Sequence, residues 1–117
     1  MVDSQKSYRI PKDNISAIFA EAMLLANYIY VDELDCAKSF ARQQTDKTIE
    51  EVFEIALNNK STLWNFIYRP HLFNGENPYF DIGCSTIGLK PDYFLWIRLS
   101  VENGEKLIKK YKLELRS

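Results

Sequence analysis

The stretch YFLWIRLSVENGEKLIKKYKLEL, residues 93–115, decides the fold that the sequence predicts. Its first part, Tyr93 to Val101, is rich in aromatic and β-branched residues, which are typical of a strand. Asn103-Gly104 is a dipeptide typical of hairpin turns. We therefore predict that residues 93–101 and 105–115 form two antiparallel strands joined at this dipeptide.

The register of this predicted hairpin follows from the apolar residues. A two-residue turn leaves both faces mixed, whereas a three-residue loop, Glu102 to Gly104, gathers most apolar residues on one face. A buried face specifies register, so we favour the three-residue loop. Its mostly apolar face holds Tyr93, Leu95, Ile97, Leu99, Leu107, Lys109, Tyr111 and Leu113. The opposite face holds Phe94, Trp96, Arg98, Lys106, Lys110 and Lys112.

The opposite face mixes aromatic and cationic side chains. Exposed aromatic residues beside arginine are common anchors of protein interfaces, so we interpret this face as a binding surface. Two other interpretations stay open. The lysines can serve only to keep an edge strand from pairing, with Phe94 and Trp96 covered, or the face can be a homodimer interface.

The N-terminal half predicts three helices. The first begins at Asp13 or Asn14, and its apolar residues recur at helical spacing: Ile15, Ile18, Phe19, Ala22, Leu25, Ala26 and Ile29. A second helix is predicted to begin at Asp32, with acidic residues in its first turn. The third begins with the capping box Thr48-Ile49-Glu50-Glu51 and ends at Asn58-Asn59.

The remaining segments complete an α+β fold. Residues 61–69 fit either a short helix or a strand, and residues 79–87 predict a strand. Three N-terminal helices would then pack on one face of a C-terminal antiparallel sheet of three to four strands. We predict one domain over residues 1–117, with residues 1–12 as a tail or a short edge segment.

The charge and the apolar stretches of the sequence limit the classes of partner and the cellular compartment that we expect. The net charge is -1, so nucleic acid or an anionic membrane would need a local basic patch. Residues 1–12 hold no apolar run, and the apolar stretch 15–31 is interrupted by Glu21 and Asn27, so we expect a cytoplasmic protein without a membrane span. The two cysteines, Cys36 and Cys84, are expected to be free thiols.

The sequence offers little catalytic chemistry. His71 is the only imidazole and stands in no motif, so we interpret it as a loop residue rather than a general base. The four glycines form no phosphate-binding motif, and the histidine and cysteines have no zinc-ligand spacing. We therefore predict a protein that is not an enzyme and has no metal or cofactor.

The favoured function is a non-enzymatic protein-binding module. Small aromatic-rich α+β chains without catalytic motifs are similar in character to bacterial immunity and antitoxin-type proteins, which bind and block a partner protein. A second surface for such a partner, for example a basic nuclease, is acidic and comprises Asp32, Glu33, Asp35, Glu50, Glu51 and Glu54.

Two alternatives belong to other classes. The first is a small cone-shaped ligand-binding or enzyme fold, whose pocket between the first helix and the sheet would contain Glu21, Tyr28, His71 and Asp81. The second is an RNA-binding module that stacks bases on Phe94 and Trp96, but the net charge argues against it.

Overall fold

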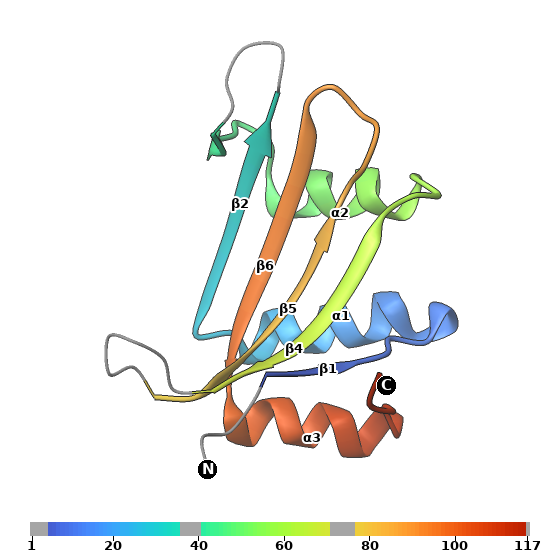
Figure 1. Ribbon diagram of the computed structural model, residues 1–117, viewed down its shortest axis with the longest axis vertical. Coiled ribbons are helices and arrows are strands. Elements are labelled where there is room, and N and C mark those ends of the chain that lie inside the picture. The colour runs from blue at the N-terminus through green and yellow to red at the C-terminus, as the bar shows by residue number, and fades with distance from the viewer. Residues whose placement is uncertain (1–4, 36–40, 71–76, 117) are drawn as a thin grey trace. The chain divides into compact units, whose positions relative to one another are not determined.

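The computed structural model describes residues 5–35, 41–70 and 77–116. Six strands form one sheet in the order β1-β4-β5-β6-β2-β3 (Figure 1). In chain order the elements are β1 (Lys6–Tyr8), a 3-10 turn η1 (Lys12–Asn14), α1 (Ile15–Leu25), β2 (Tyr28–Leu34), β3 (Gln43–Gln44), α2 (Ile49–Leu57), β4 (Leu63–Arg69), β5 (Tyr79–Ser85), β6 (Asp92–Ser100) and α3 (Val101–Tyr111).

The chain divides into two compact units, which are described separately below. The first unit comprises Met1–Tyr28, Asn65–Ile82 and Ile97–Ser117, and the second comprises Ile29–Trp64 and Gly83–Trp96. Strands β2, β4, β5 and β6 contribute residues to both. The first unit has ten basic and eight acidic residues, a net charge of +2, whereas the second has five basic and eight acidic residues, a net charge of -3.

The α+β class is confirmed, but the predicted arrangement of three N-terminal helices over three to four strands is wrong. The sheet is antiparallel and has six strands, and one of the three α-helices of the described chain lies at its C-terminal end. The predicted start of the second helix lies instead in strand β2, whose Asp32 and Glu33 pair with Gln44 and Gln43 of β3, and residues 36–40 of that prediction lie outside the described residues. The aromatic and β-branched run from Tyr28 to Val31 favours this strand over the helix that the acidic residues indicated.

The predicted C-terminal hairpin is also wrong, because residues 101–111 form helix α3. The Ser100 hydroxyl accepts a hydrogen bond from the backbone N–H of Asn103, which caps the helix. Gly104 lies inside this helix, and a Cβ there would come within 2.2 Å of the Phe80 ring. Glycine at position 104 therefore allows α3 to approach β5 closely, and it does not form a turn.

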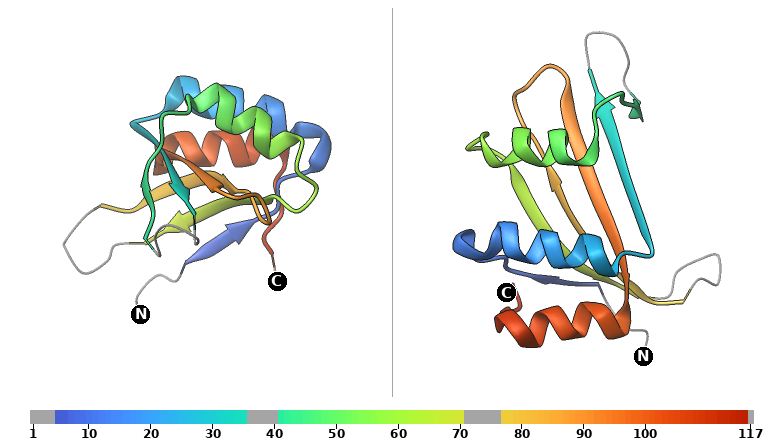
Figure 2. Two further views of the ribbon diagram at one scale, coloured as in Figure 1. Left: turned by 90° about the horizontal axis from the view of Figure 1, so that it is seen from above. Right: turned by 180° about the vertical axis from the view of Figure 1, so that it is seen from behind.

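Helices α1 and α3 cover one face of the strands in the first unit (Figure 2). Ile18, Phe19 and Ala22 of α1 are fully buried, as the spacing of apolar residues predicted. On the strands, the Phe66 and Phe80 rings meet edge-to-face with centroids 5.5 Å apart. These contacts form the core of this unit.

The core of the second unit lies between α2 and its strands. Val52 and Ala56 of α2 are fully buried, and the neighbouring Phe53 ring meets Trp64 of β4 edge-to-face at 5.9 Å. The Thr62 hydroxyl donates a hydrogen bond of 2.8 Å to the Ala56 carbonyl, which joins the end of α2 to the start of β4. Of the two structures that the sequence allowed for residues 61–69, a short helix or a strand, the strand is the one observed.

Candidate functional site

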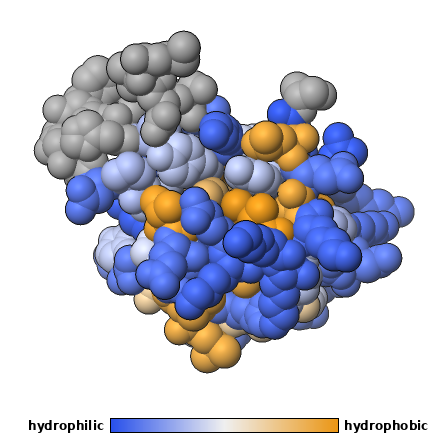
Figure 3. Space-filling model, turned by 90° about the horizontal axis from the view of Figure 1, so that it is seen from below, coloured by the Kyte–Doolittle hydropathy of each residue, from blue (hydrophilic) through white to orange (hydrophobic). Residues whose placement is uncertain are grey.

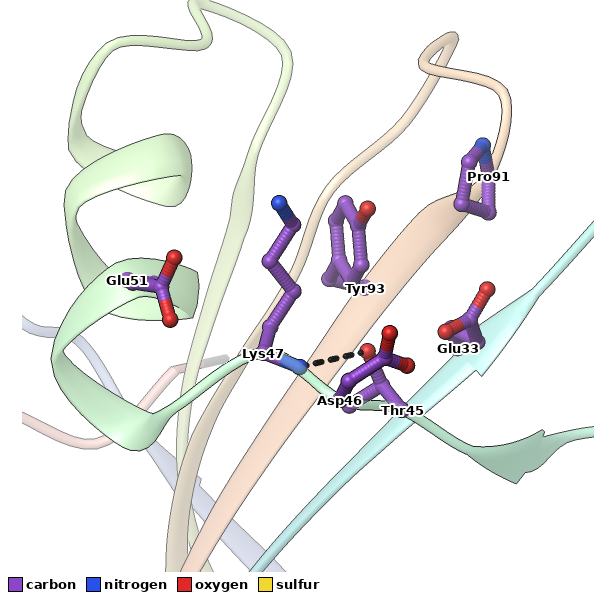
Figure 4. Close-up of a pocket in the computed structure, with 7 residues that line it drawn as sticks. All are labelled: Glu33, Thr45, Asp46, Lys47, Glu51, Pro91 and Tyr93. Carbon is purple, nitrogen blue, oxygen red and sulfur yellow. Dashed lines mark hydrogen bonds between the residues drawn. The ribbon is translucent and has the colours of Figure 1, made fainter.

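A polar hollow in the second unit is the strongest candidate site. Its volume is about 290 Å³, and it is lined by Glu33, Thr45, Asp46, Lys47, Glu51, Pro91 and Tyr93 (Figure 4). The carboxylates of Glu33, from β2, and Asp46, from the segment before α2, lie near each other in the close-up, beside Tyr93 of β6. Segments distant in sequence therefore present three carboxylates and one ammonium group to one depression.

The start of α2 fixes one side of this hollow. The Thr48 hydroxyl accepts a hydrogen bond from the Glu51 N–H at 3.1 Å, and the Glu51 carboxylate accepts one from the Thr48 N–H at 3.0 Å. This confirms the capping box predicted from sequence. The Lys47 N–H donates to the Thr45 hydroxyl at 3.1 Å, which holds the chain just before the cap.

The turn between β5 and β6 fixes the opposite side. The Asp92 carboxylate accepts a hydrogen bond from the Leu89 N–H at 2.9 Å, and the Thr86 hydroxyl accepts one from the Tyr93 N–H at 2.7 Å. Thr86 is buried, so this bond is protected from solvent. These two hydrogen bonds hold the turn and so position Pro91 and Tyr93 along the hollow.

The hollow has an excess of negative charge. The hydrogen bond from the Thr48 backbone N–H lowers the pKa of the Glu51 carboxyl, which is therefore ionised at neutral pH. Among the residues that the structure describes, Glu33 and Asp46 belong to no ion pair. Lys47 is the cation that lines the hollow beside these three carboxylates.

Some of the residues that line the hollow were predicted from the sequence, and others were not. Glu33 and Glu51 belong to the predicted acidic surface and line the hollow, but Glu50 and Glu54 of α2 do not line it. The Glu54 carboxylate accepts a hydrogen bond from the Asn58 side chain. Asp32 and Asp35 likewise do not line the hollow. Asp46, Lys47, Pro91 and Tyr93 were missed, although the charged pair Asp46-Lys47 stands directly before the recognised cap.

Three residues of the predicted aromatic-basic face, Phe94, Trp96 and Arg98, lie on β6. The Arg42 guanidinium lies 4.0 Å from the centre of the Phe94 ring. Trp96 is 8% exposed and lies against Gly83, where a Cβ would come within 2.5 Å of the indole. Leu95, Ile97 and Leu99 are fully buried, as the apolar face of the strand required.

The lysines of that predicted face lie elsewhere because there is no second hairpin strand. Lys106 and Lys110 belong to helix α3, and Lys112 is the left-handed residue that ends it. The register that placed Lys110 and Lys112 beside Phe94 and Trp96 is therefore wrong.

A separate charged cluster belongs to the first unit. The buried Asp81 of β5 forms ion pairs with Arg69 of β4 and Arg98 of β6, each with an Nε–O distance of 3.3 Å. The Arg98 guanidinium also lies 3.8 Å from the centre of the Tyr79 ring. Arg69 donates a further hydrogen bond of 3.0 Å to the Gln5 side chain.

The residues of the predicted alternative pocket have different surroundings. The Glu21 carboxylate of α1 forms an ion pair with Lys110 of α3, and this contact lowers the pKa of the Glu21 carboxyl. Tyr28 is exposed at the start of β2, whereas Asp81 belongs to the arginine cluster. His71 lies outside the described residues. The structure thus places Glu21 and Asp81 in separate clusters rather than in one cavity.

The α1–α3 groove of the first unit is apolar with charged edges. It measures about 260 Å³ and is lined by Glu21, Leu24, Leu25, Lys106, Leu107 and Lys110, with Leu24 87% exposed. From the side of α3, hydrophilic residues cover most of the visible surface and hydrophobic ones show between them (Figure 3).

The thiol that the structure describes is unsuited to nucleophilic chemistry. Cys84 of β5 is buried, and this burial raises the pKa of its thiol to about 12. Cys36 lies outside the described residues. Within the described ranges, the helices are all too short or too polar to cross a membrane.

Comparison with known proteins gave no relative: no family model, no curated protein and no solved structure matches this chain.

Proposed function

We propose that this protein is a non-enzymatic binding module that binds and blocks a partner protein with a basic surface, in the manner of an immunity or antitoxin-type inhibitor. The observation that supports the proposal is the hollow of the second unit, where Glu33, Asp46 and Glu51 surround a depression beside Tyr93. A lysine or arginine side chain of the partner would be the group that enters it.

The chemistry of the hollow fits a cationic side chain. Carboxylates accept short, charge-assisted hydrogen bonds from guanidinium or ammonium groups, and these are stronger than bonds between neutral groups. Tyr93 adds an aromatic ring, which attracts cations through its face. Pro91 and Tyr93 supply apolar surface for the aliphatic part of the entering side chain.

The net charge of the second unit also favours a partner protein with a basic surface. Its net charge of -3 would attract a basic surface over distances up to the Debye length, about 8 Å at physiological salt. Electrostatic complementarity raises association rates and disfavours acidic partners. Inhibition would follow from coverage of the partner's basic surface and needs no chemical step from this chain.

Co-expression with the products of neighbouring genes tests this proposal. We expect a stable complex with a basic protein, weakened about tenfold or more by the double substitution Glu33→Gln and Asp46→Asn, because two charged acceptors are lost. Affinity is measured by calorimetry on the purified complex at two salt concentrations.

The matched control neutralises two exposed carboxylates of the first unit, Glu102→Gln and Glu105→Gln, which should leave the affinity unchanged. Equal losses in both double variants would show that only net charge matters and would contradict a site at the hollow. The absence of any complex with a neighbouring product would count against the inhibitor function itself.

A further inference from the structure

We propose that this protein associates head to tail: the acidic helix α2 of one copy docks on the groove between α1 and α3 of a second copy. The groove belongs to the first unit and α2 to the second, so the two contacting surfaces differ, as in a heterologous interface. The contact is separate from the acidic hollow and does not depend on the function proposed for it.

Helix α1 is apolar on the side that faces solvent as well as on the side that faces the core. Ser16 and Glu21 are its two polar residues. Ala17, Ala20 and Leu24 are exposed, and their spacing of three and four residues places them on one stripe of the helix. A helix that is apolar all round is normally buried, so we expect another chain to cover this stripe.

The groove beside this stripe is apolar, with two lysines on its α3 side. Leu24 and Leu25 of α1 and the buried Leu107 of α3 supply its apolar surface. Lys106 and Lys110 supply its positive charge. Its volume of about 260 Å³ is smaller than that of small-molecule pockets, which measure about 300–1,000 Å³. The groove therefore fits a few side chains of a neighbouring helix better than a complete ligand.

Both lysines are open to a carboxylate from another molecule. Lys106 is 66% exposed, and its contact with Glu102 of the same helix is an exposed pair at 3.9 Å, which contributes little. Lys110 pairs with Glu21, which also lines the groove. Its side chain is 59% exposed, and an ammonium group has three donors, so this pair leaves room for a second acceptor.

Helix α2 presents the complementary stripe. Glu50, Glu54 and Leu57 recur at spacings of four and three residues, so they lie on one side of the helix, away from the buried Val52 and Ala56. All three are exposed, and the two glutamates do not line the acidic hollow. These glutamates belong to the acidic surface predicted from the sequence, and the groove gives that surface a cationic counterpart.

The two stripes match in spacing. Residues four apart on a helix are separated by about 6 Å along its axis, which holds for the two lysines as for the two glutamates. Helices α1 and α3 lie side by side and run in opposite directions (Figure 1). An incoming α2 that runs antiparallel to α3 brings its Glu54 to Lys106. Glu50 then meets Lys110, and Leu57 lies beside the C-terminal end of α1. The net charges of the units, +2 and -3, favour the same contact.

The test is the molar mass of the full chain by sedimentation velocity as the protein concentration rises to about 1 mM. We expect a mass that increases with concentration and decreases with added salt, because the contact includes two ion pairs. Lys106→Glu and Glu54→Lys should each raise the dissociation constant about tenfold or more, because each replaces an attraction by a repulsion. An equimolar mixture of the two variants should associate again, because the intact α2 of the first meets the intact groove of the second.

Lys109→Glu is the matched control, because Lys109 is exposed on α3 but does not line the groove. It changes the net charge as Lys106→Glu does and should leave association unchanged. Leu24→Ser, at a side chain that is 87% exposed, changes neither the charge nor the core and should also weaken association. A chain that stays monomeric up to about 1 mM would overturn the proposal. So would a mixture of the two variants that does not associate, or equal losses for Lys106→Glu and Lys109→Glu.

Discussion

The two units use their charged residues in opposite ways. In the first unit, cations exceed anions, and the central ones are held in ion pairs: Arg69 and Arg98 around Asp81, and Lys110 with Glu21. In the second unit, anions exceed cations, and within the described residues Glu33 and Asp46 face the hollow without an ion pair. The central charges of the first unit are thus paired within the fold, whereas two described carboxylates of the second unit line a hollow and belong to no ion pair.

The largest effect is expected from Asp81→Asn in the first unit. Asparagine keeps one acceptor oxygen but loses the buried negative charge between the two guanidinium groups, and we expect about 2–4 kcal/mol of destabilisation. The estimate is below that for a fully buried pair because both arginines are partly exposed. Denaturant unfolding measures it.

Glu33→Gln is the counterpart in the second unit and should change the free energy of unfolding by about 0.5 kcal/mol or less, because Glu33 is half-buried and forms no ion pair within the described residues. If Asp81→Asn and Glu33→Gln lowered the free energy of unfolding equally, the contrast between paired charges in the first unit and unpaired carboxylates at the hollow would be contradicted.

The next effect concerns Gly104. A methyl group there would overlap the Phe80 ring, so Gly104→Ala should destabilise by about 1–3 kcal/mol even though alanine favours a helix. Thermal and denaturant unfolding provide the measurement, with Glu105→Ala at a neighbouring exposed position as control. Stabilisation by Gly104→Ala would contradict the close approach of α3 to β5.

A smaller effect is expected at the cap of α2 in the second unit. Thr48→Ala removes the acceptor for the Glu51 N–H and should cost about 1 kcal/mol. Denaturant unfolding measures the loss, and Ser61→Ala, at an exposed position after α2, serves as a comparison outside the helix cap. An unchanged midpoint for Thr48→Ala would mean that the cap contributes nothing.

The pH dependence of stability tests separately whether the ionised Glu51 carboxylate of this cap stabilises the fold. The folded-state pKa of Glu51 lies below its ordinary value of 4.5, so the stability it contributes is fully present above that pH. It is lost as pH falls through the lowered folded-state pKa. The stability difference between wild type and Glu51→Gln should therefore shrink below about pH 4.5, and a difference that grows on acidification would contradict the assignment.

The two units also differ in how much of their structure the sequence predicts. The Thr48 cap is a local signal that no distant contact overrides, and the alternation from Leu95 to Leu99 reports a buried face directly. Helix α3 was missed because Asn103-Gly104 has the composition of a turn, while the reason for Gly104 is its contact with Phe80, 24 residues earlier. That reason is tertiary and leaves no local pattern.

The candidate site was predictable to a similar extent. Glu33 and Glu51 stood out as acidic residues, but the pattern placed Glu33 on a helix rather than on β2. Tyr93 and Pro91 join the site only because the β5–β6 turn lies beside the start of α2. Their proximity depends on strand pairing across the second unit, which a single sequence does not encode in any short motif.

The most direct test of the central claim compares two short peptides that differ only in charge, one with arginine and one with citrulline at the same position. The labelled full chain is titrated with each by NMR. The account predicts that the arginine peptide shifts the resonances of Glu33, Asp46, Lys47 and Tyr93 to saturation, and that the citrulline peptide does not. Equal shifts from both peptides, or shifts confined to the first unit, would contradict it.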